Sequence, residues 1–562
     1  MAKISFFALG GQDENGKNCY VLEIDDNIFV INAGVKIPLN SNIGIDTIIP
    51  DFSYLEKNSN KIKGIFITDA KNESFSALPW LVMKIKKIKI FCSVFTKSLI
   101  IERMNKYFIN SQDYEIHTIS SKTNFGKDIS VIPINLAGSI PGILGLNFMT
   151  EDGVILFMTN FLVGNLGIYG NTNLAKIQQL CKHPKGILAL IADSGRSNYP
   201  GKTIDKIFAK KFLESTFLAA DSKSRIIVGA YDEEMLSIQE IVDLAIKFKR
   251  KITTYGKKYD KLYDMISKLE SKNKTIQHSR PNFFDYKLAN KENNSVVLIT
   301  SSPERIHTRF ERILNKEDVV FKLKQSDHVI MITPPINGME QAHAKVLDEI
   351  AKVTSNLIDI NEADFSTCRP SRDDLLELIQ ATQPKYFFPI QGLFRYLVVA
   401  GNLAYKAKVP KQNILILQNK RAVNFINGVL FSSKKSIKCD SEVFVDGFGV
   451  GDISSEVLRE REMLSRDGVI IISFLLDYKT KKIVSKPNII EYGILSKENR
   501  TDVHKIIENI IATNFQSITK INDKIVKEIQ EKIQKAIKRK MFRFYDKEPV
   551  VSVLIQNSLG DK

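Results

Sequence analysis

The sequence predicts a soluble α/β protein with several domains. Its 562 residues correspond to roughly three to four domains. Hydrophobic residues make up 44% and charged residues 25% of the chain, which is enough apolar material for a sizeable core. Short β-branched or aromatic strands alternate with polar loops and helical periods, and this alternation indicates sheets covered by helices.

The first elements form a meander of strands. Residues 3–10 are expected as a strand, and a polar turn containing glycine follows. Residues 19–24 and 27–31 are the two strands of a hairpin around Asp25 and Asp26. Asn32-Ala33-Gly34 closes the second strand.

A strand, a polar turn and a helix-like run follow each other over residues 61–80. The strand has apolar residues at Ile62, Ile65, Phe66 and Ile67. Residues 68–74 read Thr-Asp-Ala-Lys-Asn-Glu-Ser, and residues 76–80 have helical character. A layered α/β fold keeps its active site at such strand-to-helix loops. The loop composition itself favours a solvated turn.

Later strands are expected at 153–161 and 187–192. From about residue 205 the pattern is that of a doubly wound α/β insert. Its expected strands are 225–230, 251–254, 295–300 and 328–333. Near the C-terminus, a strand at 469–477, a long amphipathic region at 501–544 and a strand at 550–556 indicate a small α+β domain.

Several short frames are specific enough to indicate a family. They are Gly-Lys-Asn at 16–18, Ala-Leu-Pro at 77–79, Ser-Ile-Pro at 139–141, Pro-Lys-Tyr-Phe at 384–387 and Val-Asp-Gly-Phe-Gly-Val-Gly-Asp at 445–452. With them the chain resembles the ribonuclease J family, from Phe7 to about Gln556. The resemblance implies a metallo-β-lactamase αββα sandwich with an inserted β-CASP α/β domain and a small C-terminal α+β domain. The implied boundaries are residues 1–204 and 362–430 for the sandwich, 205–361 for the β-CASP domain, 431–445 for a linker and 446–562 for a C-terminal oligomerisation domain.

The same resemblance implies two zinc ions, but the ligand positions have changed. An ammonium such as that of Lys71 has no lone pair to give, and a neutral amide is a poor bridging ligand. Of the acidic motif residues, only Asp193 is retained. We therefore expect no catalytic residues, no metal and no cofactor. The positions that the resemblance assigns to the metal motifs are called the degenerate positions below. They are Asn32, Asp69, Lys71, Glu73, Ser74, Gly138, Asn160, Asp193 and Gln391.

The histidines support this expectation, and this support does not depend on how the sequence is aligned with the family. The chain has seven, and none lies in a segment that resembles a metal motif, where a two-zinc hydrolase similar to this family would need about five. Each is expected to be a surface or helix residue. They are His117, His183, His278, His307, His328, His343 and His504.

The formal charge of +17 and the pI of about 9.3 favour a polyanionic partner such as RNA. The alternative is a lysine excess that comes from codon composition. The candidate RNA contacts are Arg369 and Arg372, with Thr367 and Ser371 as hydroxyl donors. Alternatively, Arg369 fills the former metal site and pairs with Asp193 or Glu73.

The cysteines and the apolar runs indicate a cytoplasmic protein. The five cysteines form no C-x-x-C pair, which is typical of free thiols in a reducing compartment. No apolar run reaches 18 residues, and the N-terminus is unlike a signal peptide.

Three functions stay open at this point. The first is a catalytically silent paralogue that binds an active ribonuclease J and helps to hold RNA. The second is a weakly active metal-dependent ribonuclease, exo- or endonucleolytic, that uses Asp69, Glu73 and Asp193. The third is a structural subunit without RNA contact. In each case we expect a homo- or hetero-oligomer.

Overall fold

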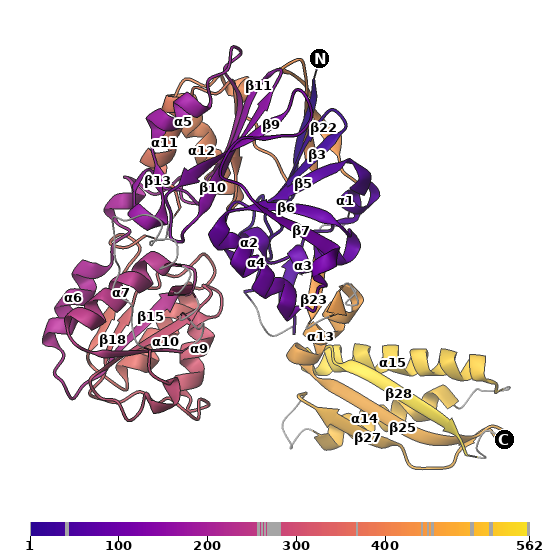
Figure 1. The fold of residues 1–562 in the computed structure, drawn as a ribbon. Helices are drawn as coiled ribbons and strands as arrows, with labels where there is room; N and C mark the ends of the chain where they lie inside the picture. The colour runs from indigo at the N-terminus through magenta and orange to yellow at the C-terminus, as the bar shows by residue number, and fades with distance from the viewer. Residues whose placement is uncertain are drawn as a thin grey trace. The chain divides into compact units, whose positions relative to one another are not determined.

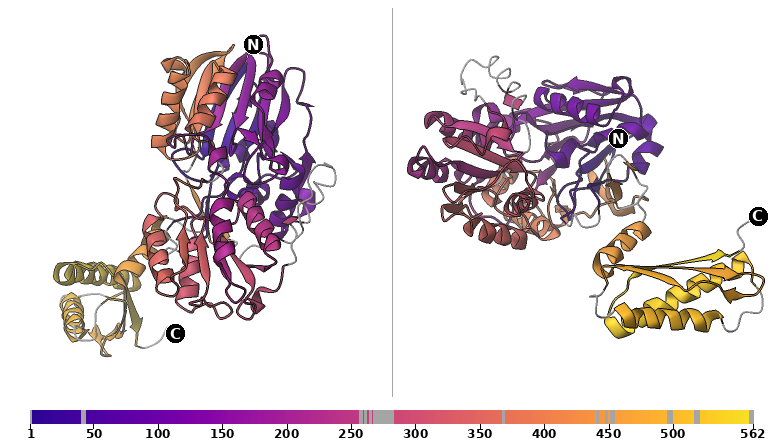
Figure 2. Two further views of the ribbon diagram at one scale, coloured as in Figure 1. Left: turned by 90° about the vertical axis from the view of Figure 1, so that its left-hand side faces the viewer. Right: turned by 90° about the horizontal axis from the view of Figure 1, so that it is seen from below.

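The structure, a computed structural model, describes most of the chain and divides it into two compact units. The described residues are 2–39, 44–255, 259, 262–263, 266, 283–366, 369–439, 442–446, 449–450, 455–494, 500–515 and 521–558. The first unit comprises Met1–Leu39 and Thr47–Val443, and the second comprises Asn40–Asp46 and Phe444–Lys562. Figure 1 shows the fold, and Figure 2 gives two further views.

Two mixed sheets face each other in the first unit. In sheet order, the eight-stranded sheet is β22 (Val429–Ser436), β21 (Arg421–Ile426), β1 (Lys3–Gly10), β2 (Cys19–Ile24), β3 (Asn27–Ile31), β5 (Ile62–Phe66), β6 (Ile88–Cys92) and β7 (Tyr114–Thr118). The six-stranded sheet is β20 (Tyr386–Ile390), β14 (Ile187–Asp193), β11 (Gly153–Met158), β10 (Ile143–Thr150), β9 (Ser130–Leu136) and β8 (Thr123–Asn124). Their inner faces form one aromatic core, which includes Phe29 and Phe66 from one sheet and Phe148 and Phe388 from the other.

Helices cover the outer faces, as the αββα prediction requires. Helices lie outside the six-stranded sheet (Figure 1), where they share a core with Leu156 and Leu190. These helices are α5 (Leu174–Leu180), α11 (Arg372–Thr382) and α12 (Phe394–Lys406). The helices next to the eight-stranded sheet are α1 (Ser53–Lys57), α2 (Asn72–Phe75), α3 (Leu78–Lys84) and α4 (Val94–Lys106). Among the described residues, the short strands outside both sheets of this unit and outside the insert are β4 (Thr47–Ile49), β12 (Gly164–Asn165) and β13 (Asn171–Thr172).

The insert is a parallel sheet with helices on both faces, as predicted. Its strand order is β16 (Lys251–Tyr255), β17 (Ser295–Ser301), β15 (Ile226–Tyr231), β18 (His328–Met331) and β19 (Leu357–Asp359). The last strand was not predicted, because three residues carry too little pattern to be recognised. One face packs on α6 (Lys210–Ala219) and α7 (Met235–Lys247), and the other packs on α9 (Ile306–Leu314) and α10 (Glu340–Ala351).

The second unit is a sheet with helices on one face. β25 (Val469–Asp477) pairs antiparallel with β26 (Lys482–Ile483) and β27 (Asn488–Tyr492), and parallel with β28 (Val550–Asn557). The predicted region 501–544 divides into α14 (Arg500–Phe515) and α15 (Asp523–Tyr545). Ile507 and Ile533 of these helices pack on Ile470 and Val553 of the sheet. The remaining elements are β23 (Val443–Asp446), β24 (Gly449–Val450) and α13 (Ser455–Asp467).

One boundary prediction was wrong. Residues 431–436, expected as the start of a linker, form the last six of the eight residues of β22. Arg421 of β21 lies opposite Ser436, so the hairpin continues through the lysine-containing segment. The polar composition that indicated a linker is instead that of an edge strand, where lysine is common.

Candidate functional site

The loop after β5 is buried, so the prediction of a solvated turn was wrong. The Thr68 and Asp69 side chains are fully buried, and Lys71 is only 6% exposed. Asn32 fixes the loop: its Nδ2 donates to Thr68 Oγ1 at 2.9 Å, and its Oδ1 accepts the backbone N–H of Thr68 at 2.9 Å. An amide in place of an aspartate therefore keeps the loop conformation through neutral hydrogen bonds.

Neutral donors surround Asp69. Its carboxylate accepts the backbone N–H of Lys71 at 3.0 Å, Asn160 Nδ2 at 3.1 Å and the Thr68 hydroxyl at 2.9 Å. Burial raises the pKa of Asp69 above its ordinary value. The carboxylate is thus part of a closed polar network in the interior of the sandwich.

Two carboxylates of the insert close over the same loop. Glu233 Oε1 accepts the backbone N–H of Asn72 at 2.7 Å, and Lys71 Nζ lies 3.7 Å from Glu234 Oε1. Lys71 and Glu234 are both at least nine-tenths buried. The ammonium that replaces a ligand is therefore held by the β-CASP domain.

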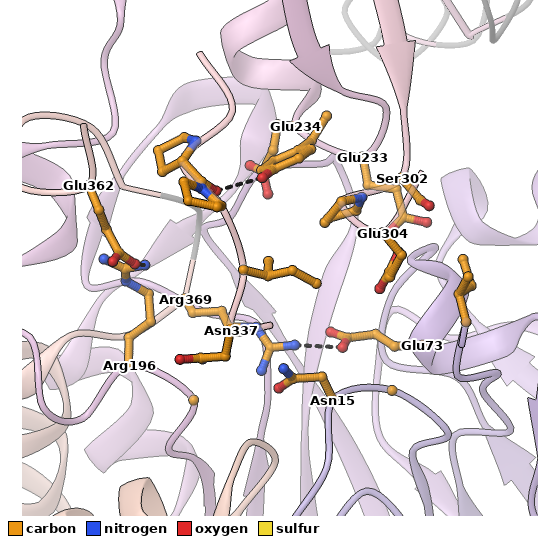
Figure 3. Close-up of a pocket in the computed structure, with 18 of the residues that line it drawn as sticks. Asn15, Glu73, Arg196, Glu233, Glu234, Ser302, Glu304, Asn337, Glu362 and Arg369 are labelled. Carbon is orange, nitrogen blue, oxygen red and sulfur yellow. Dashed lines mark hydrogen bonds and ion pairs between the residues drawn. The ribbon is translucent and has the colours of Figure 1, made fainter. Parts of the chain in front are cut away.

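Arg369 occupies the centre of the site. Its Nη2 lies 2.5 Å from Glu73 Oε2 and its Nη1 lies 3.5 Å from Asp193 Oδ1 (Figure 3 shows the Glu73 pair). Burial tends to lower the pKa of Arg369, but the carboxylates of Glu73 and Asp193 outweigh burial and raise it. The expectation that Arg369 pairs with Glu73 or Asp193 is confirmed, and it pairs with both.

Asp193 is fixed by the backbone as well. It accepts the N–H of Gly195 at 2.8 Å and that of Asn160 at 3.1 Å, and its side chain is fully buried. Glu73 comes from α2, Asp193 from the end of β14, and Arg369 from the loop before α11. The guanidinium therefore joins the two sequence-separated parts of the sandwich.

Three of the degenerate positions keep an uncommon backbone conformation. Asn32, Asn160 and Gln391 have φ values of 66°, 52° and 59°, in the left-handed region that side chains other than glycine rarely adopt. Such conformations persist only where the surrounding structure determines them. The surrounding structure therefore determines the backbone of these three loops.

The other degenerate positions offer no metal ligand. A Cβ atom on Gly138 would lie 2.8 Å from the Asn160 carbonyl oxygen and 2.2 Å from Ile143 Cδ1, so an imidazole would require the chain to shift. Ser74 and Gln391 are buried at 0% and 1% exposure. Their neutral oxygens and amide are weak ligands for zinc, which binds thiolate, imidazole and carboxylate.

The site does not fit the two zinc ions that the family resemblance implies. Among the described residues, no group of three or more His, Cys, Asp and Glu could hold a metal ion. The three carboxylates at the degenerate positions are already bound: Glu73 and Asp193 to a guanidinium, and Asp69 to amide and hydroxyl donors. A second cation between Glu73 and Asp193 would have to displace Arg369.

The predicted RNA contacts are engaged within the protein. Ser371 forms a capping box with Asp374 at the start of α11, and Arg372 Nε lies 2.8 Å from Asp373 Oδ1. Together with the pairing of Arg369, these contacts do not support Arg369, Ser371 and Arg372 as hydrogen-bond donors to RNA phosphates. Thr367 lies outside the described residues.

A cavity of about 540 Å³ lies next to Arg369, between the sandwich and the insert. Among the described residues that line it, carboxylates outnumber Lys and Arg. The carboxylates are Glu73, Glu233, Glu234, Glu304, Glu340, Asp359 and Glu362, and the cations are Lys36, Lys71, Arg196 and Arg369. Such a lining repels phosphate.

Sequence reasoning did not assign a role to the insert's carboxylates. Figure 3 shows Glu233, Glu234 and Glu304 on one side of the cavity and Glu73 with Arg369 on another. The available signal was position: Glu233 and Glu304 stand just after the strands predicted at 225–230 and 295–300, at the edge where parallel sheets carry their sites.

Comparison with known proteins agrees with this fold and with the short motifs found in the sequence. The family model for the β-CASP domain of ribonuclease J matches residues 223–350, and the model for the ribonuclease J C-terminal domain matches residues 456–558. Ribonuclease J2 of Bacillus subtilis is 28% identical over 88% of this chain and 87% of its own length. The chain belongs to the ribonuclease J family.

Two further relatives extend the comparison. Ribonuclease J 2 of Staphylococcus aureus is 25% identical over 90% of this chain and 91% of its own. An uncharacterized protein of Mycoplasma genitalium is 29% identical over the full length of both chains. The similarity to ribonuclease J relatives therefore includes both sandwich segments, the insert and the C-terminal domain. Within the described part of the chain, no helix is long and apolar enough to cross a membrane.

Proposed function

We propose that this protein is a catalytically silent member of the ribonuclease J family that acts in RNA processing and decay. It binds RNA and an active ribonuclease J paralogue, and it leaves hydrolysis to that partner. The single observation that supports silence is the guanidinium of Arg369 between Glu73 and Asp193. A fixed organic cation occupies the centre of the former metal site and cannot activate water.

A zinc ion contributes to hydrolysis by lowering the pKa of a bound water and by polarising the scissile group. A guanidinium or an ammonium has no open coordination position for a water oxygen, so neither arginine nor lysine generates a bound hydroxide as zinc does. The residues of this chain perform a different task here. Arg369 neutralises two buried carboxylates, and the hydrogen bonds of Asn32 and Asn160 keep the loops in place.

The alternative of weak metal-dependent activity through Asp69, Glu73 and Asp193 is less favoured. Each of these carboxylates already has a partner, and Lys71 adds a cation at the same loop. The overall charge of +17 supports RNA as a partner, and the names of the Bacillus and Staphylococcus relatives place them among ribonucleases. The alternative of a subunit without RNA contact would attribute this charge to codon composition alone.

Assembly is part of the proposal because the C-terminal sheet has an open face. The register of β25 with β27 and β28 places Val469, Ile471 and Leu475 beside Ile490 and Leu554, on the face opposite to the helices. Leu475, Ile490 and Leu554 are 38%, 39% and 50% exposed. The same face carries Ser473 and Ser552, and a mixed surface with exposed apolar residues suits a homodimer or a dimer with a related chain.

A nuclease assay with matched partners tests the proposed function. The full chain is incubated with labelled single-stranded RNA and added Zn²⁺, Mn²⁺ or Mg²⁺, beside the active paralogue as positive control. We expect no cleavage by this chain alone and co-purification of the two proteins. Cleavage that disappears in Asp193→Asn would establish the weakly active alternative, and absence of both RNA and paralogue binding would refute the proposal.

A further inference from the structure

The second half of α15 concentrates positive charge on the C-terminal domain. Between residues 532 and 545 the helix carries six Lys or Arg residues and no Asp or Glu. These cations are Lys532, Lys535, Lys538, Arg539, Lys540 and Arg543. All are exposed except Lys538, which is half-buried. We call this set the α15 basic cluster.

Helical spacing explains why the cluster points outward. Val526, Ile529, Ile533, Ile537 and Met541 recur every three or four residues and are buried against the sheet. The opposite face therefore carries Lys535, Arg539 and Arg543, which follow one another at intervals of four residues. The helix rises about 1.5 Å per residue, so the cations from 532 to 543 extend over roughly 16 Å.

The cations of this face are weakly neutralised. Lys535 lies 3.9 Å from Glu531, a pair of two exposed side chains that contributes little. In the part of the chain that the structure describes, Lys538, Arg539 and Arg543 form no ion pair within 4.0 Å. Lys538 and Arg539 lie near the carboxylates of Glu456, Glu460 and Glu548 without pairing with them, whereas Arg369 pairs with two carboxylates inside the protein.

Exposed aromatic rings interrupt the basic cluster. Phe542 and Phe544 are 54% and 56% exposed, although their own helix buries its other large apolar residues. A hollow of about 470 Å³ lies beside Phe542, within the size range of small-ligand pockets. Its lining carries as many carboxylates as cations: Glu456, Arg459, Glu460 and Met463 of α13, Lys538, Arg539 and Phe542 of α15, and Glu548. Aromatic rings next to cations suit unstacked nucleobases and phosphates respectively.

We infer that the outer face of α15, with the hollow beside Phe542, binds single-stranded RNA. The phosphates contact the basic cluster over about four to five nucleotides, given a spacing of about 3.4 Å for stacked residues of one strand. A base stacks on Phe542, and the carboxylates of Glu456 and Glu460 at the hollow accept hydrogen bonds from its amino group. The inference rests on the proposed RNA-binding function and assigns it to this surface rather than to the acidic cavity.

A membrane surface fits this helix less well. Helices that lie in a membrane interface insert a continuous apolar face. Here that face is already buried on the sheet, from Val526 to Met541. Only the rings near the end of the helix remain, and rings scattered among cations are typical of nucleic-acid contacts.

The test uses the full chain and two fourfold variants of equal charge. The cluster variant replaces Lys535, Lys538, Arg539 and Arg543 by Gln. The control variant replaces four exposed lysines of the first unit by Gln: Lys89, Lys122, Lys127 and Lys223. Fluorescence anisotropy measures the affinity for a labelled 20-nucleotide single strand and for its duplex between 50 and 300 mM salt.

We expect the cluster variant to bind the single-stranded RNA at least about tenfold more weakly than the wild type at 100 mM salt. The slope of log affinity against log salt concentration should become shallower by about 0.7 for each phosphate that the protein no longer neutralises. The control variant should stay within about twofold of the wild type, as only long-range attraction is reduced. Phe542→Leu should weaken binding to the single strand by about fivefold or more and leave duplex binding unchanged.

The outcomes separate this inference from the proposed function. If the wild type binds RNA and the cluster variant binds as tightly as the control variant, the α15 assignment is wrong while RNA binding stands. If the wild type binds no RNA at 50 mM salt, both fail. Loss of paralogue binding with unchanged RNA affinity would make the face a protein interface and overturn the inference. Photo-crosslinking of thiouridine-containing RNA to the wild type, mapped to peptides, gives an answer even if a variant fails to fold.

Discussion

The guanidinium of Arg369 and the carboxylate of Glu73 lie 2.5 Å apart, although 296 residues separate them in the chain. A second carboxylate, that of Asp193, lies on the other side of the guanidinium. A positive charge thus lies between two carboxylates that come from different loops. It belongs to the chain itself, so these carboxylates are balanced without a bound ion.

Arg369→Met should destabilise the protein by about 3–5 kcal/mol, because it leaves the fully buried Asp193 and the partly buried Glu73 without a counter-charge. Urea denaturation followed by circular dichroism measures the change in the free energy of unfolding. Arg372→Met is the matched control, since Arg372 is exposed and pairs only with Asp373 among the described residues. The control should change the free energy of unfolding by less than about 0.5 kcal/mol. Equal stability of the two variants would show that the Arg369 pairs contribute nothing.

Protein purified without chelators should contain well under one zinc per chain. The reason is the donor set: Gly138, Ser74 and Gln391 offer no imidazole, and Arg369 lies where a cation would bind. Elemental analysis by mass spectrometry of the intact chain, with the active paralogue purified in parallel, measures the content. Stoichiometric zinc that survives dialysis and is lost in Asp193→Asn would contradict the prediction.

Glu240 predicts a pH dependence of stability. Burial raises its pKa to about 7, partly offset by the backbone N–H of Ala209, which donates to its carboxylate. A pKa raised in the folded state gives stability that is fully present below the unfolded value near 4.5 and is lost as pH rises through 7. Glu240→Gln should therefore flatten the decline in melting temperature between pH 5 and 8, with a gain of roughly 1–3 kcal/mol at pH 8. An unchanged decline in the variant would exclude Glu240 as its source.

Much of the fold followed from the sequence because its signals are local. The strands β1, β2 and β3 have the predicted bounds, since β-branched runs between polar turns specify them well. The four longer strands of the insert were also recognised. β19 and the strand pairing of residues 431–436 were missed, because short or lysine-rich edge strands depend on a neighbour that sequence pattern does not reveal.

The sequence predicted which metal ligands are missing from the site, but it predicted less well what the residues in their place do. The missing imidazoles could be read directly from positions such as Gly138 and Gln391. The burial of the loop at Thr68 and Asp69 could not, because polar residues in a turn suggest solvent. Thr68 contacts Asn32 and Thr159, and Asp69 contacts Asn160, all of which are distant in sequence. The pairing of Arg369 was one of two alternatives, and only the three-dimensional structure could decide between them.

The last prediction concerns the open face of the C-terminal sheet. Leu475→Lys, Ile490→Lys and Leu554→Lys together place three like charges on this face, so we expect the homo- or hetero-oligomer to dissociate. The variant should keep its fold, because these side chains point away from the core shared by Ile470, Val553 and the helices. Light scattering, with and without the active paralogue, measures the mass.

Leu218→Lys with Val319→Lys provides the control, since both residues are exposed and apolar but belong to the first unit. It should leave the oligomer intact. A chain that lacks residues 446–562 should be monomeric for the same reason as the triple variant. An unchanged mass after both the triple substitution and the deletion would refute the interface, because an oligomer held by this sheet cannot tolerate three ammonium groups at its apolar centre. A wild type that is monomeric with and without the paralogue would refute the assembly itself.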